Sequence, residues 1–117
     1  MKGGDRKVYP QSIVPMIRLV AHAYGVCPGL AVIICRRESS FNPTAVGDQG
    51  QAVGLWQWHI ASWNQVRDSM GLRGLDLRKD PYESTITAMF AMGVLHLYRW
   101  WSTYKPALNE MAGLPDE

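Results

Sequence analysis

The chain has 117 residues, of which 47% are hydrophobic and 19% are charged, and its formal net charge is +2. This composition supplies one hydrophobic core and is too poor in charge for a disordered chain, so we expect a single folded domain over residues 12–117 behind a flexible lead-in at residues 1–11. The small net charge argues against the dense basic surface that nucleic-acid-binding proteins carry.

The sequence contains no apolar run of the about 18 residues that a membrane-spanning helix needs, and its first residues do not form a secretory signal peptide. Cys27 and Cys35 are eight positions apart. On a helix their Cα atoms would lie roughly 10 Å apart, beyond the about 7 Å limit for a disulfide, so we expect two free, buried thiols. We find no zinc-ligand spacing and no phosphate-binding loop, and therefore expect neither a metal nor a cofactor.

Two helices are predicted in the first third of the chain. Ser12 is a suitable N-cap for a first helix, which is expected to stop at Gly25. Pro28 is suited to the first turn of a second helix, which should end near Ser39 because Pro43 disfavours helix just before it. This second helix is apolar on every side over much of its length, so we expect it to be buried at the centre of the fold.

The next segment, residues 41–58, contains one proline and three glycines and predicts a loop with a small hairpin. Its last four residues are expected to be extended. In that conformation Leu55 and Gln57 would point to one side, and Trp56 and Trp58 to the other.

Helices are predicted again in the second half. Residues 60–70 form a short helix, and Asp-Pro-Tyr-Glu at residues 80–83 is a strong helix start with an N-cap aspartate and a first-turn proline. An apolar stripe over residues 82–104 predicts one long helix of about 22 residues, and a short helix is expected after Pro106. The expected fold class is all-α with a small loop or β excursion in the middle. Trp63, Trp100 and Trp101 lie at helical spacing and are expected in the core rather than on a binding surface.

Glu38 is the principal candidate for a catalytic residue. At offsets of seven, four and three it shares a helix face with Ala31, Ile34 and Cys35, which must be packed. It also lies at a helix C-terminus, where the helix dipole disfavours negative charge. Both effects raise a carboxyl pKa, as a general acid near neutral pH requires. The alternative is a surface glutamate that pairs with a neighbouring arginine.

Two short motifs around this glutamate resemble a known family. Residues 38–45, Glu-Ser-Ser-Phe-Asn-Pro-Thr-Ala, resemble the ESxFNPxA signature of lysozyme-like lytic transglycosylases, and residues 54–57, Gly-Leu-Trp-Gln, are similar to their GLMQ signature. Asp-Gln-Gly at residues 48–50 resembles the DxG that precedes GLMQ in goose-type lysozymes. The resemblance implies a lysozyme-like fold and a muramidase that cuts the β-1,4 bond between N-acetylmuramic acid and N-acetylglucosamine in peptidoglycan.

The resemblance also implies roles for individual residues. Glu38 would protonate the glycosidic oxygen, Ser39 would contact the sugar or brace Glu38, and Gln57 would reach the sugar from the cleft wall. Trp56, His59 and Tyr98 are further candidates for substrate contacts, with a capping or exposed role as the alternative for His59. The Asn-Ile pair and the later Tyr-Asn-Gly motif of the family are missing.

The sequence leaves open which group attacks the sugar. In an inverting lysozyme a second carboxylate activates water about 6.5–9.5 Å from the acid, and Asp48 is the candidate, although aspartate also favours turns on its own account. In a lytic transglycosylase a hydroxyl of the sugar attacks instead, forming a 1,6-anhydro ring, and one carboxylate is enough. We favour hydrolysis, with transglycosylation as the alternative and a non-catalytic glycan-binding or phage-tail or secretion-assembly module as the second.

The expected partner is the glycan strand of peptidoglycan, with no nucleic acid, no stable membrane insertion and a monomeric state. Without a visible export signal, we expect synthesis in a bacterial cytoplasm and action on the cell wall, a pattern that a phage-encoded lysin would fit.

Overall fold

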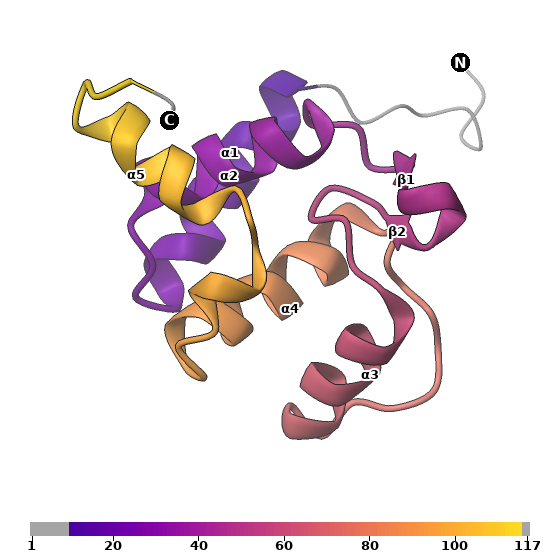
Figure 1. The fold of residues 1–117 in the computed structure, drawn as a ribbon. Coiled ribbons are helices and arrows are strands. Elements are labelled where there is room, and N and C mark those ends of the chain that lie inside the picture. The colour runs from indigo at the N-terminus through magenta and orange to yellow at the C-terminus, as the bar shows by residue number, and fades with distance from the viewer. Residues whose placement is uncertain (1–9, 116–117) are drawn as a thin grey trace, which may run out of the picture.

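The computed structural model describes residues 10–115. Within them the chain forms five α-helices, two short strands and two 3-10 turns (Figure 1). Helix α1 spans Pro10–Ala23. It begins two residues before the expected cap Ser12, so residues 10 and 11 belong to the helix and not to the predicted lead-in. Residues 1–9 of that lead-in lie outside the described part.

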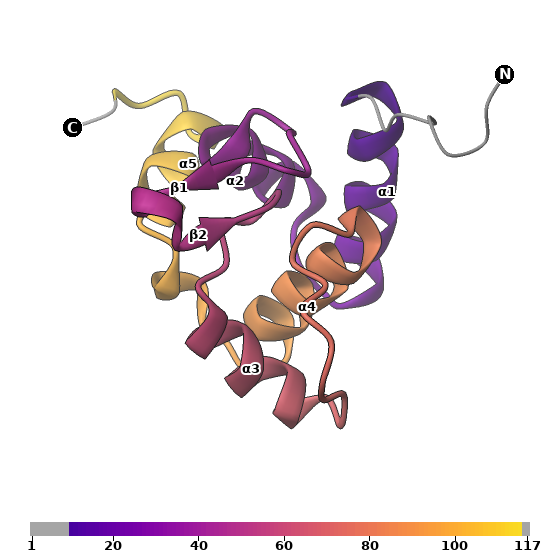
Figure 2. The same ribbon diagram turned by 90° about the vertical axis from the view of Figure 1, so that its right-hand side faces the viewer.

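Helix α2 spans Pro28–Ser39, with a first-turn proline at one end and Ser40 in the left-handed conformation at the other. These bounds confirm the prediction. Helix α1 packs against α2 and α4, while α5 packs against α2, so α2 lies between two neighbours (Figure 2). Its buried residues are Leu30, Ala31, Ile34 and Cys35.

The strands β1 (Val46–Gly47) and β2 (Ala52–Val53) form an antiparallel hairpin, closed by the 3-10 turn η2 (Asp48–Gly50). This confirms the small β excursion inside a helical fold. The extended segment predicted for residues 55–58 is wrong, because the chain turns there and Gln57 has a φ of 53°. Leu55, Trp56 and Trp58 all enter the core.

Helix α3 spans Ile60–Ser69, and α4 spans Pro81–Gly93. The expected start of α4 is confirmed, since the Asp80 carboxylate accepts a hydrogen bond of 2.8 Å from the Glu83 backbone N–H. The prediction of one long helix is wrong beyond Gly93, where α4 ends. The chain turns there, forms the 3-10 turn η3 (Tyr98–Trp100), and enters α5 (Tyr104–Met111) two residues before Pro106.

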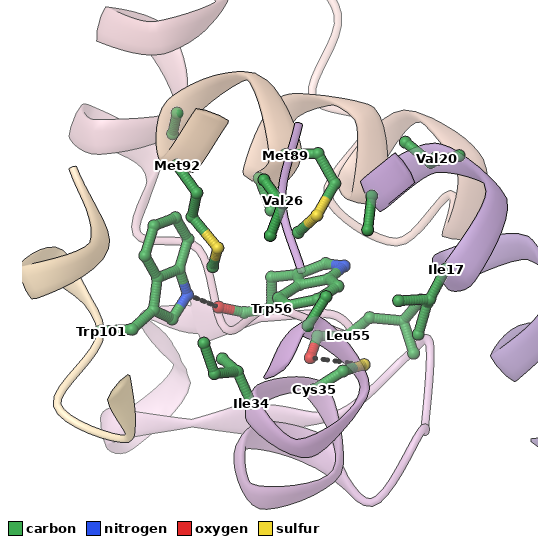
Figure 3. Packing of buried hydrophobic residues seen from close by; sticks show 14 of the residues in the cluster. Ile17, Val20, Val26, Ile34, Cys35, Leu55, Trp56, Met89, Met92 and Trp101 are labelled. Atoms are coloured by element: carbon green, nitrogen blue, oxygen red, sulfur yellow. Dashed lines mark hydrogen bonds between the residues drawn. The ribbon is translucent and has the colours of Figure 1, made fainter. Parts of the chain in front are cut away.

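The core is a continuous cluster between α1, α2, α4 and the segment after the hairpin (Figure 3). Trp56 lies at its centre, fully buried beside Met89, with its indole N–H donating to the Thr85 hydroxyl at 2.9 Å. Large apolar side chains buried in this way stabilise the fold by roughly 1.5–3 kcal/mol each. Cys35 is a free, buried thiol as predicted, but Cys27 is free and exposed because it precedes α2 instead of facing the core. Among the described residues, every helix is too short or too polar to cross a lipid bilayer.

Candidate active site

A pocket of about 480 Å³ opens where the end of α2, the hairpin, the start of α3 and the segment before α5 meet. It therefore gathers residues from distant parts of the chain. Its lining consists of Glu38, Asp48, Ala52, Trp56, Gln57, Trp58, His59, Ser62, Trp100, Trp101 and Ser102.

Glu38 lies in the last turn of α2 and is partly buried. Its Oε2 accepts a hydrogen bond of 2.7 Å from the hydroxyl of Thr103. Burial raises the pKa of the Glu38 carboxyl above its ordinary value, the Thr103 hydrogen bond partly offsets this, and the charge of Asp48 raises it further. The group is thus shifted toward the protonated form that a general acid needs.

Thr103 and its neighbours form a wall that the sequence did not reveal. Thr103 precedes α5 and is 65 positions from Glu38, so no local pattern joins them. Trp101 is buried as expected, and its indole N–H donates to the Trp56 carbonyl oxygen at 2.9 Å (Figure 3). The prediction that Trp100 is a core residue is wrong, because it is 43% exposed and lines the pocket. Its free aromatic surface is the kind that suits a sugar face.

Gln57 lines the pocket from the turn that follows β2. Its side-chain amide donates to the carbonyl oxygens of Ala45 at 3.2 Å and Gly54 at 3.0 Å. A Cβ on Gly47 would lie 2.5 Å from the Gln57 Oε1, so glycine at this strand position leaves room for the side chain. A tight turn, and not strand alternation, gives Gln57 its place.

Trp56 and Gln57 are adjacent in the sequence but differ in exposure. Trp56 forms part of the pocket wall with 0% of its surface exposed, and its indole N–H is already bonded to Thr85. It supports the wall from behind and has little surface to offer a substrate.

Asp48 and His59 face each other at the edge of the pocket. The Asp48 Oδ2 lies 2.8 Å from the His59 Nε2, and the two side chains are 67% and 43% exposed. Asp48 has a φ of 49° and is followed by Gln49 at 57°, two left-handed residues in succession. His59 is the N-cap residue of α3, but its side chain makes no capping hydrogen bond. The contact therefore joins the hairpin turn to the start of a helix.

The other two candidates lie elsewhere. The Ser39 hydroxyl donates to the Cys35 carbonyl oxygen at 3.2 Å, inside α2, and is not part of the pocket lining. Tyr98 packs its ring against Tyr104, with centroids 5.0 Å apart, and is also outside that lining.

The pocket has an acidic character, since its described lining includes two carboxylates but neither lysine nor arginine. Between residues 10 and 115 the structure contains no group of three or more histidine, cysteine or acidic side chains that could hold a metal ion. The arrangement has the groups for proton transfer to and from a neutral polar polymer such as a glycan.

The sequence matches the family described as the Transglycosylase SLT domain over residues 15–111. That range includes every residue of the pocket described above.

The chain is also similar to two proteins named membrane-bound lytic murein transglycosylase C. It is 34% identical over 80 residues to the protein from Actinobacillus pleuropneumoniae serotype 5b (strain L20), covering 68% of this chain and 21% of that protein. It is 38% identical over 69 residues to the protein from Histophilus somni (strain 2336), covering 59% of this chain and 18% of that protein. The chain thus spans about one fifth of the length of these relatives.

Proposed function

This chain belongs to the transglycosylase SLT domain family, and we propose that it cleaves the glycan strands of peptidoglycan as a lytic transglycosylase. The family match and the names of the relatives support transglycosylation, the alternative prediction from the sequence, over hydrolysis, which was its main prediction.

The observation that carries the proposal is Glu38: a partly buried carboxyl with a raised pKa, beside a pocket, with one oxygen bonded to Thr103. In the first step the protonated Glu38 donates its proton to the glycosidic oxygen as the bond to C1 of the muramic residue breaks. The resulting carboxylate then accepts the proton of that sugar's 6-hydroxyl as its oxygen bonds to C1. One residue thus serves as acid and then as base, and no water is consumed.

The other pocket residues have supporting roles in this proposal. Gln57 is held by two backbone carbonyl oxygens, which leaves its Oε1 as a fixed acceptor for a substrate hydroxyl or amide N–H. Trp100 lines the pocket from the segment before α5, and its exposed aromatic surface is available to a sugar ring. Asp48 has no required part in transglycosylation, because the sugar supplies its own nucleophile.

Product analysis tests the proposal. Purified cell walls are digested with the wild-type chain, and the released muropeptides are separated and weighed. An anhydro end is lighter than a reducing end by one water, so transglycosylation predicts anhydro ends, whereas reducing ends would refute it in favour of hydrolysis.

Glu38→Gln keeps the shape of the side chain but removes the transferable proton. A positioned general acid contributes about 10²–10⁴-fold, so we expect wall cleavage to fall by at least about 100-fold while wall binding persists. Equal release of fragments by both proteins would remove Glu38 from the mechanism. No release by either protein, with wall binding intact, would instead indicate the non-catalytic glycan-binding module.

A further inference from the structure

The contact between Asp48 and His59 has no part in the reaction proposed above, although both residues line the same pocket as Glu38. Asp48 is the only other carboxylate in the described lining, and its charge contributes to the raised pKa of Glu38. It is therefore near enough for its charge to act on the proton donor.

We propose that His59 is a positioning residue that holds the Asp48 carboxylate and so keeps it from activating water, which leaves the sugar hydroxyl as the nucleophile. This inference rests on the proposed transglycosylase function and adds a determinant of its product. The His59 Nε2 is hydrogen-bonded to the Asp48 Oδ2 at 2.8 Å. Without this bond, Oδ2 would be available to a water molecule.

The reaction that the contact between His59 and Asp48 prevents is inverting hydrolysis. In that reaction a free carboxylate accepts a proton from water, the water oxygen bonds to C1, and the leaving oxygen takes the proton of the acid. Both a water site and an unoccupied carboxylate oxygen are needed. A bond to His59 withdraws one oxygen and fixes the direction of the other.

The backbone explains why a side-chain contact is needed to hold Asp48. Asp48 and Gln49 both have left-handed backbone conformations although neither is glycine. They lie in the exposed turn of a hairpin whose strands are only two residues long. Such a turn is held by its surroundings, and the His59 contact ties it to the start of α3. Removing the imidazole should therefore let the Asp48 carboxylate move and also leave its Oδ2 free to contact water.

The experiment compares products from intact cell walls for four chains. They are the wild type, His59→Leu, the double variant His59→Leu with Asp48→Asn, and His22→Leu, which makes the same chemical change at an exposed histidine on α1 that does not line the pocket. The His59 side chain is 43% exposed and caps nothing, so its replacement is expected to leave the fold intact.

We expect anhydro ends from the wild type and His22→Leu. A freed general base contributes about 10²–10⁴-fold, so even a partly freed Asp48 should raise the ratio of reducing to anhydro ends at least about tenfold in His59→Leu. The double variant should return to the wild-type ratio, because no carboxylate is left to activate water. His59→Gln, which keeps an N–H donor, should stay close to the wild type.

Three outcomes would overturn the inference. If the wild type gives anhydro ends and the ratio of reducing to anhydro ends is unchanged in His59→Leu, the proposed role of His59 is overturned but the proposed function is not. Reducing ends that persist in the double variant would show that a loosened turn admits water without Asp48. Reducing ends from the wild type would overturn the proposed function, and the proposed role of His59 with it.

Discussion

Replacing Thr103 by valine tests how the proton on Glu38 is controlled. Thr103 donates its hydroxyl proton to the Glu38 Oε2 at 2.7 Å, and this bond lowers the pKa of the carboxyl against the larger effect of burial. Valine has nearly the same shape but cannot donate. The pKa of Glu38 should therefore rise further in Thr103→Val. Since the acid must be protonated, the alkaline limb of the activity profile should move to higher pH.

The size of the effect follows from the two protonation states. A hydrogen bond to a charged group contributes about 1.5–3 kcal/mol, and one to a neutral group about 1 kcal/mol. Loss of the hydroxyl thus costs the ionised form about 0.5–2 kcal/mol more than the neutral form. Because Glu38 is only partly buried and water replaces some of the bond, we expect the lower half of that range. At about 1.36 kcal/mol per factor of ten, relative activity above the limb should rise roughly twofold to eightfold.

The assay is the initial rate of wall clearing over a pH series, normalised to each variant's own plateau. Normalisation separates the shift of the limb from any loss of rate caused by a less well oriented Glu38. Thr103→Ser keeps the hydroxyl and is the matched control, with a limb expected at the wild-type position. Thr103 makes no side-chain cap for α5, so neither change should unfold the chain. A limb that stays in place or moves to lower pH in Thr103→Val would refute the reasoning.

Three further predictions concern stability and accessibility. Gly54→Ala would place a Cβ 2.0 Å from the Arg78 carbonyl oxygen at a φ of 88°, so we expect a loss of about 2–5 kcal/mol in urea unfolding, and an unchanged midpoint would contradict this. Burial raises the pKa of the Cys35 thiol to about 12, while Cys27 is exposed. One thiol should react with a disulfide reagent in the native chain and two in denaturant; rapid reaction of both in the native chain would be evidence against it. The folded-state pKa of Glu38 is raised, so the stability linked to its proton is complete below the unfolded pKa and is lost as pH rises through the folded one. Glu38→Gln should therefore melt at a higher temperature than the wild type at neutral pH, with the gap closing in acid, and a lower melting temperature at neutral pH would count against the burial argument.

The sequence was sufficient for the features that depend on neighbours along one helix. Ala31, Ile34 and Cys35 are all fully buried, and Glu38 follows them on the same face at the helix end, so its partial burial could be predicted from spacing alone. The bounds of α2 likewise follow from Pro28 at one end and the disfavoured helix before a proline at the other.

The sequence was insufficient where the backbone adopts rare conformations without glycine. Gln57 and Asp48 both have positive φ angles, and neither residue type demands one. The turn at Gln57 replaced the expected alternation of side chains, and the turn at Asp48 brought its carboxylate to His59. These conformations are fixed by contacts with distant segments, such as the bond between Gln57 and Ala45, which no local pattern encodes.

The end of α4 shows most clearly why the far wall of the site was missed. The stripe of apolar residues continues past Gly93, but the helix does not. Leu97 donates its backbone N–H to Ala91 O at 2.9 Å, a wider turn than an α-helix makes, and His96 between them has a φ of 60°. Gly93 is required for a different reason, because a Cβ there would lie 2.1 Å from the Tyr24 carbonyl oxygen.

This break is what completes the candidate site. A continuous helix would carry Thr103 about 15 Å along its axis beyond Gly93, whereas the observed chain turns and runs back toward α2 (Figure 1). Arg36 and Arg37 at the end of α2 both pair with Glu110 on α5, the helix that Thr103 precedes. The two arginines that directly precede Glu38 in the sequence thus help to hold α5 against α2. One helix end therefore supplies the carboxyl and the contacts that dock the segment with its hydrogen-bond donor.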